Sequence, residues 1–260
     1  MSKDSLVTCQ DLTVIYPNSQ TIILDHLSFT IEKGEFICVL GPSGCGKSTL
    51  LNIIAGYLSP TKGQALFKGE AIQGPSWQRG VMFQQQALYP WLDVFENVAF
   101  GLKVRQQSTQ EIQQKVPTLL KMIGLEDYTH EYIFNLSGGM QQRVQLARVL
   151  ANDPELILMD EPLGALDAIT RTKIQALLRK LWHQGNKTYF MITHDIDEAL
   201  SLATKIIVLS KNPGRIIKTY QVNYTSKAYT ASHPNEYMDN RYLQLKDEIY
   251  DMLALSLIHI

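Results

Sequence analysis

Residues 41–49 read GPSGCGKST and lie between the apolar run EFICVL and the helical pattern LLNIIAGYL. A buried strand, a glycine loop and a helix in this order match the phosphate-binding P-loop pattern GxxxxGK[ST]; a chance glycine turn is the alternative. Gly44 and Gly46 allow close backbone approach, so that N–H groups of the loop and the helix N-terminus surround phosphate oxygens. We expect Lys47 to reach the β- and γ-phosphates of a nucleotide and Ser48 to bind Mg²⁺. The predicted nucleotide-binding residues of this loop are Gly41, Pro42, Ser43, Gly44, Cys45, Gly46, Lys47, Ser48 and Thr49.

A second apolar run, LILMDEP (residues 156–162), contains two neighbouring acids. Polar side chains that follow a buried parallel strand emerge at the carboxyl edge of the sheet, where P-loop proteins bind their substrate. We therefore predict that Asp160 holds the Mg²⁺ shell and that Glu161 accepts a proton from the attacking water. The alternative is that Glu161 caps the segment that follows.

Composition excludes several classes of partner. The 24 Lys and Arg residues nearly balance the 25 Asp and Glu residues, giving a net charge of -1, and no basic run stands out. The sequence therefore predicts no nucleic-acid partner. Cys9, Cys38 and Cys45 lack the spacing of a zinc or disulfide framework and fit reduced cytosolic thiols. The longest apolar runs are strand-length, far short of the ~20 residues of a membrane span.

The hydrophobic pattern changes period along the chain. Strand patterns precede the P-loop, helical patterns dominate from about residue 93 to 151, and strands then alternate with helices. This alternation predicts a mostly parallel sheet with an inserted helical subdomain. Within the helical part, we place Pro117 near the start of a helix and Gly124 at its stop.

A second phosphate cradle is predicted at residues 135–150, NLSGGMQQRVQLARVL, where a serine and two glycines precede a helix. A helix N-terminus favours an anion, although a simple N-cap would explain the same residues. With the P-loop and the paired acids, LSGGM (residues 136–140) makes the chain resemble, over nearly its whole length, the ATP-binding subunits of ABC transporters. The resemblance implies that two chains pack head to tail and that this signature segment closes over ATP held by the partner. Met140 departs from the family's common Gln, while Ser137, Gly138 and Gly139 match.

Four further residues carry the resemblance. Gln84 looks like the glutamine that touches Mg²⁺ and water, and His194 like the histidine that contacts the γ-phosphate. Tyr16 resembles the aromatic residue that stacks on adenine, and Asp167, in LGALD, an acid that meets the opposite P-loop. The open alternatives are a polar loop residue for Gln84, a structural histidine for His194 and a core residue for Tyr16. The implied catalytic residues are Glu161, His194, Gln84 and Lys47, and the implied metal ligands are Ser48, Gln84 and Asp160.

The resemblance also implies the fold and its boundaries. The fold is α/β: a RecA-like P-loop NTPase core with a mostly parallel sheet, an N-terminal antiparallel β subdomain and an inserted helical subdomain. We assign the ATPase domain to residues 1–222, with the helical subdomain at about 87–151, and a linker and C-terminal amphipathic helix to 223–254. Residues 255–260, LSLIHI, do not continue that helix and resemble a translated sequencing adapter, so we expect a non-native tail. A genuine apolar tail is the alternative.

Two segments narrow the resemblance to an importer branch, namely residues 74–102 and SKNPGRI (residues 210–216). That branch takes up nitrate, sulfonates such as taurine, bicarbonate or pyrimidine precursors. It implies ATP and Mg²⁺ as cofactors, transmembrane permease subunits, an extracytoplasmic solute-binding protein and a second ATPase subunit, with the chain at the cytoplasmic membrane face. Apolar anchors for a permease helix would be Tyr89, Trp91, Leu92 and Phe95, although Phe95 could instead pack inside the helical subdomain.

Two other classes remain open on sequence alone. A soluble ABC ATPase acting on nucleic acid or in translation would be expected to show a second cassette, a coiled-coil insertion or basic patches. A P-loop kinase or G-protein would not account for LSGGM and His194 together. The features expected of the first class are not found in this sequence, whereas LSGGM and His194 are both present.

Overall fold

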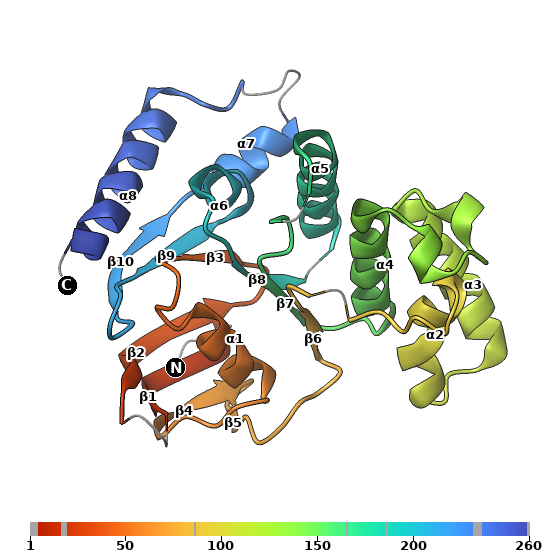
Figure 1. Cartoon of the computed structure of the whole chain (residues 1–260), viewed down its shortest axis with the longest axis horizontal. Coiled ribbons are helices and arrows are strands. Elements are labelled where there is room, and N and C mark those ends of the chain that lie inside the picture. Colours follow the sequence, from red (N-terminus) through yellow and green to blue (C-terminus); the bar gives the residue numbers. More distant parts are fainter. Residues whose placement is uncertain are drawn as a thin grey trace.

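The computed structural model describes residues 5–16, 20–85, 87–164, 166–185, 187–230 and 236–258. Within these ranges the chain forms two β-sheets, with helices packed around them (Figure 1). The predicted fold class is confirmed. A mostly parallel sheet carries the P-loop, an antiparallel sheet is formed by N-terminal strands, and a helical part lies to one side.

The larger sheet has the strand order β10-β9-β3-β8-β7-β6. Its strands are parallel except β10, which pairs antiparallel with β9. The central strands are buried along their whole length, which explains their nearly continuous apolar sequences. The strands are β3 (Phe36–Leu40), β6 (Arg79–Met82), β7 (Leu156–Asp160), β8 (Thr188–Ile192), β9 (Lys205–Leu209) and β10 (Ile216–Gln221).

The smaller sheet is antiparallel, in the order β2-β1-β4-β5. A single parallel bridge, between Leu24 and Gly214, links β2 to the loop between β9 and β10. This bridge brings the two sheets together next to the P-loop. The strands are β1 (Ser5–Ile15), β2 (Ile22–Glu32), β4 (Lys62–Phe67) and β5 (Glu70–Ala71).

The helices divide into two groups (Figure 1). One group forms the helical part, α2 (Val94–Val104), α3 (Thr109–Met122) and α4 (Gly138–Ala151), with short 3-10 turns at Glu126–Tyr128 and Ile133–Asn135. The other packs around the larger sheet, α1 (Lys47–Ala55), α5 (Ala168–Gln184), α6 (Ile196–Leu202), α7 (Tyr224–Thr230) and α8 (Asn240–Ile258). None of these helices in the described ranges is both long and apolar enough to pass through a bilayer.

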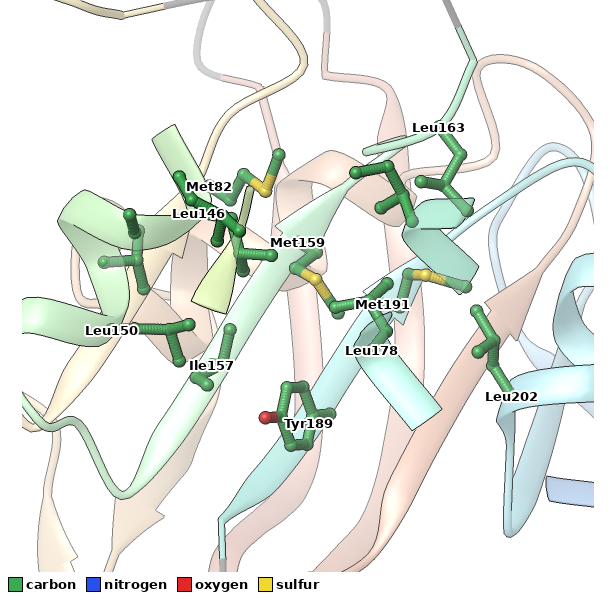
Figure 2. Close-up of a cluster of buried hydrophobic side chains, with 14 of the residues drawn as sticks. Met82, Leu146, Leu150, Ile157, Met159, Leu163, Leu178, Tyr189, Met191 and Leu202 are labelled. Atoms are coloured by element: carbon green, nitrogen blue, oxygen red, sulfur yellow. The ribbon is translucent and has the colours of Figure 1, made fainter. Parts of the chain in front are cut away.

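Two buried clusters cover the two faces of the larger sheet. One contains the antiparallel sheet and α1, and the other extends from the sheet into the helical part. Figure 2 shows side chains of the second cluster, in which Leu146 and Leu150 of α4 lie near Met82 and Ile157 of the sheet. The helical part therefore shares a continuous core with the strands that carry the predicted site.

Three local expectations are corrected. Helix α3 begins at Thr109 rather than near Pro117, because Ser108 and Glu111 form a capping box that starts it earlier. The segment predicted as a linker contains α7, whose residues Tyr224 and Thr225 are buried.

The third correction concerns the C-terminus. Helix α8 continues through the first four residues of LSLIHI to Ile258, because no glycine or proline stops it. His259 and Ile260 lie outside the described residues. The origin of this tail, and the domain boundaries, stay predictions.

Candidate functional site

The P-loop connects β3 to α1 and opens onto a cavity of about 450 Å³. Gly44 and Gly46 have φ of 80° and 95°, the left-handed conformation that glycine adopts without strain. The predicted nucleotide residues that line the cavity are Tyr16, Ser43, Gly44, Gly46, Lys47, Ser48 and Thr49, together with Gln84 and Glu161. The loop thus forms a concave surface with a lysine, hydroxyl groups and a carboxylate.

Three predicted residues of the loop lie away from this cavity. The Cys45 side chain is buried in the core, where desolvation raises the pKa of its thiol. The carbonyl oxygens of Gly41 and Pro42 accept hydrogen bonds of 2.7 and 3.0 Å from Lys47 Nζ. These residues shape the loop and hold its lysine.

Ser48 and Asp160 come together at the ends of α1 and β7. Burial raises the pKa of the Asp160 carboxyl above its ordinary value, and the neighbouring Glu161 carboxylate adds to the rise. A hydrogen bond with the Ser48 side chain and the charge of nearby Lys47 offset only part of it. The pair places two hard oxygen donors beside the P-loop.

Glu161 contacts two other predicted catalytic residues. Its Oε2 atom accepts a 3.0 Å hydrogen bond from Gln84 Nε2 and lies 3.5 Å from His194 Nδ1. The carboxylate therefore contacts two side chains from other parts of the chain, which speaks against the alternative that Glu161 caps the segment that follows. Two residues from distant parts of the chain, Gln84 and His194, therefore converge on one oxygen of the Glu161 carboxylate.

The backbone of Glu161 adopts an uncommon conformation, with φ of 45°. A left-handed conformation costs a residue with a Cβ roughly 1–2 kcal/mol. The backbone is held there because its N–H donates to Ile192 O at 3.0 Å and its carbonyl accepts from Gly164 N at 3.3 Å. Such strain at a reactive group is typical of functional sites.

The exposed fractions of the His194 and Tyr16 side chains test the alternatives of a structural histidine and a core tyrosine. The His194 side chain is 64% exposed, which does not fit a structural histidine in the core. Tyr16 is 47% exposed at the cavity rim, which does not fit a core residue. Both side chains face solvent or the cavity.

The predicted signature segment lies at the N-terminus of α4. Ser137 caps this helix by accepting from Met140 N at 3.3 Å, and Met140 packs against the core. Gly139 is needed for close packing, because a Cβ there would lie 2.7 Å from Thr170 Cγ2 of α5. Asp167 caps α5, and its hydrogen bonds with Thr170 lower the pKa of its carboxyl.

The signature segment does not line the P-loop cavity of its own chain. Of its three predicted contact residues, Gly138 lines a neighbouring cavity of about 260 Å³, beside Glu161 and His194. Gln142, which sequence reasoning missed, is buried and lines the same cavity. Its only sequence signal was its place one turn into the helix after LSGGM.

A third hollow, of about 300 Å³, lies between β6 and helices α2 and α4. Its lining includes Trp77, Tyr89, Phe100, Val104, Arg105 and Arg148. Trp91 is 70% exposed beside it, with its ring 5.5 Å from that of Tyr89. The expectation that Phe95 anchors a permease helix is wrong, because its side chain is only 8% exposed and packs in the core of the helical part. Leu92 is half-buried.

Comparisons with known proteins find similar sequences over most of the chain. A family model described as ABC transporter matches residues 24–164. The taurine import ATP-binding protein TauB of Ruegeria pomeroyi is 46% identical over 91% of this chain and 89% of its own length. TauB of Pelagibacter ubique is 45% identical over 94% of this chain and 93% of its own length.

Two solved structures are similar in fold. One is the ATP-binding cassette MJ0796 in a dimeric post-hydrolysis state bound to ADP and Pi. Its TM-score is 0.74 at 35% identity, covering 84% of this chain and 99% of that one. The other is cbiO1 of Clostridium perfringens, part of an ABC transporter complex, with a TM-score of 0.77 at 25% identity, covering 95% of this chain and 99% of that one.

Proposed function

Because the chain belongs to the ABC transporter family as an ATP-hydrolysing cassette, we propose that it powers the import of a small sulfonate of the taurine type. The observation that carries the site assignment is the convergence of Gln84 and His194 on one oxygen of Glu161, beside the P-loop cavity. The solute rests on the TauB relatives, which cover most of this chain and are named for taurine import. Uptake of labelled taurine by cells with and without this chain tests the solute.

In the proposed site the loop N–H groups and Lys47 bind the phosphates of ATP. Ser48, Asp160 and Gln84 hold Mg²⁺, which neutralises charge on the phosphates when bound. These oxygen donors suit a hard cation. Among the described residues, no cluster of three or more His, Cys, Asp or Glu offers a complete metal site, so phosphate oxygens and water would complete the shell.

Glu161 is the proposed general base. Its carboxylate would take the proton of the attacking water, while Gln84 and His194 orient the carboxylate from either side. His194, just beyond the end of β8, would also donate toward the γ-phosphate. Tyr16, at the rim of the cavity, would stack on the adenine ring.

We further propose that ATP is enclosed between two copies of the chain. The signature segment does not line the cavity of its own P-loop, so Ser137 and Gly139 would serve the nucleotide of a partner. Asp167 would meet the partner's P-loop. Two identical chains would then form an isologous pair with two enclosed nucleotides.

The permease contact is proposed at the hollow between β6, α2 and α4. Its apolar lining and the exposed Trp91 suit a short amphipathic helix laid into a groove. Such a contact would hold the chain at the cytoplasmic face of the membrane as one part of an importer that also includes a solute-binding protein. Co-purification with a multi-span membrane subunit, lost on Trp91→Glu, tests this assignment.

Glu161→Gln tests the base and the second cradle together. Glutamine keeps the shape of the side chain but does not accept the proton, so hydrolysis should fall by about 10²–10⁴-fold. Binding should persist because Lys47, Ser48 and Asp160 are untouched. Light scattering with Mg-ATP should then show a stable dimer of the variant and a weaker or transient one of the unmodified chain.

Adding Ser137→Arg provides the control, because it places bulk and charge at the mouth of the second cradle. This double variant should be monomeric with Mg-ATP. A Glu161→Gln chain that stays monomeric at saturating ATP would overturn the head-to-tail arrangement. A dimer that is indifferent to Ser137→Arg would place the contact elsewhere.

A further inference from the structure

The loop between β9 and β10 packs against the back of the P-loop. This loop carries NPGR (residues 212–215), part of the segment that resembles an importer branch. Gly214 is buried, and a Cβ on it would lie 2.1 Å from the carbonyl oxygen of Cys45, in the middle of the P-loop. Real Cβ atoms do not approach oxygen this closely, so only glycine fits without movement.

Leu24 joins the two loops from the side of β2. Its Cδ2 atom would lie 2.5 Å from a Cβ on Gly46 and 3.1 Å from a Cβ on Gly214. Leu24 itself is completely buried. One leucine is therefore in close contact with a P-loop glycine that lines the cavity and with the glycine of the β9–β10 loop.

The β9–β10 loop is held more firmly than the P-loop segment it touches. Gly214 N donates to Ile23 O at 2.8 Å, and Gly214 O accepts from Asp25 N at 3.0 Å. Arg215 also pairs with Asp25, whose side chain is only 8% exposed, through Nε at 2.8 Å and through Nη2.

Two further hydrogen bonds within the β9–β10 loop also hold it in place. Ser210 Oγ donates to Pro213 O at 2.8 Å and accepts from Arg215 N at 2.9 Å. At residues 42–46, Pro42 O accepts from Cys45 N at 3.3 Å and from Lys47 Nζ at 3.0 Å, and Gly46 O accepts from Leu50 N at 2.9 Å. These bonds hold the carbonyls of Pro42 and Gly46 rather than the Cys45 carbonyl between them. If the two loops clash, the P-loop is the one that yields.

We propose that Gly214 and Arg215 are positioning residues for ATP binding, because they set the position of the Cys45 carbonyl and thereby the direction of the neighbouring P-loop N–H groups. They touch no substrate themselves. The proposal rests on the proposed function, in that it takes the P-loop as the ATP site. It assigns the NPGR motif a role in nucleotide affinity.

Gly214→Ala tests the contact, since Gly214 does not have a positive φ and alanine adds only the clash. The full-length chain is titrated with Mg-ATP by calorimetry. A shifted loop should raise the Kd for ATP by about tenfold or more. The matched control is Gly74→Ala, where a Cβ meets nothing within 4 Å and φ is not positive, and where the Kd should not change.

Arg215→Ala gives a second measurement if Gly214→Ala does not fold. The Arg215 side chain is 63% exposed, so its removal leaves the core intact while it releases the loop from Asp25. The Kd should rise by about threefold, as expected for one partly exposed ion pair. Lys211→Ala, in the same loop, controls for the loss of a positive charge and should leave the Kd unchanged.

Lys47→Ala separates this proposal from the site assignment. If Lys47→Ala loses ATP binding while Gly214→Ala and Arg215→Ala bind as the unmodified chain does, the positioning role is wrong and the P-loop site stands. If Lys47→Ala binds ATP normally, the P-loop assignment itself fails. A lower melting temperature of Gly214→Ala without nucleotide, with an unchanged Kd, would show a purely structural role and would also overturn the proposal.

Discussion

Replacing Glu161 with glycine should greatly slow ATP hydrolysis and yet stabilise the fold. Its φ of 45° places an ordinary L residue in the left-handed region, at a cost of roughly 1–2 kcal/mol. Glycine adopts this conformation without steric cost, but its greater conformational freedom in the unfolded chain lowers the free energy of unfolding by roughly 0.5–1 kcal/mol. The net expectation for Glu161→Gly is a gain of about 0.5–1 kcal/mol in the free energy of unfolding.

Losing the side-chain contacts of Glu161 acts against this gain, which therefore lies toward the lower end of its range. The partner His194 is 64% exposed, and Gln84 is also exposed, so each contact belongs to the weak class worth about 0–1 kcal/mol. Glu161→Gln is the matched control, because glutamine keeps the left-handed backbone and an oxygen that accepts from Gln84. We expect its stability to stay within about 0.5 kcal/mol of the unmodified chain, as for other substitutions outside the core.

Calorimetric melting without nucleotide measures both variants. For a chain of this size a gain of 0.5–1 kcal/mol corresponds to a rise in Tm of roughly 1–4 °C. Hydrolysis should fall by about 10²–10⁴-fold in both. If Glu161→Gly melts at or below the temperature of Glu161→Gln, the backbone at this position does not store the strain inferred from its φ.

Three further outcomes are expected. Met140→Gln should leave the hydrolysis rate nearly unchanged, because the backbone N–H groups of the signature segment remain; a large rise in turnover would contradict this expectation. The same substitution should lower the free energy of unfolding by up to about 1 kcal/mol, because Met140 packs against the core. Ser108→Ala should cost about 1 kcal/mol at pH 7 by removing the cap of α3. Hydrogen bonds from the backbone N–H and the hydroxyl of Ser108 lower the folded-state pKa of Glu111, and alanine removes only the hydroxyl. The hydroxyl's bond to the carboxylate stabilises the fold above the unfolded pKa and is lost as pH falls through the folded pKa, so the difference between the two chains in urea unfolding should shrink, but not vanish, below about pH 4. Deleting residues 255–260 should not impair ATP hydrolysis, because residues 255–258 form only the last turn of α8, and a loss of activity in a phosphate-release assay would assign the segment a role.

The sequence alone determined the parts of this protein that are local. GPSGCGKST identified the P-loop, because a strand, a glycine turn and a helix are encoded by consecutive residues. LILMDEP placed Asp160 and Glu161 at a strand end for the same reason. The capping box at Ser108 was equally readable but was overlooked in favour of Pro117, a residue that sits within α3.

Only the tertiary structure decided which distant residues meet. Gln84, Glu161 and His194 are separated by dozens of residues, and the contact of Gly214 with Cys45 spans more than half the chain. The left-handed backbone of Glu161 and the burial of Phe95 likewise depend on neighbours from other elements. Hydrophobic period and motif spacing report the preferences of adjacent residues, whereas close packing between elements fixes contacts, burial and strain, and it acts only once the chain has folded.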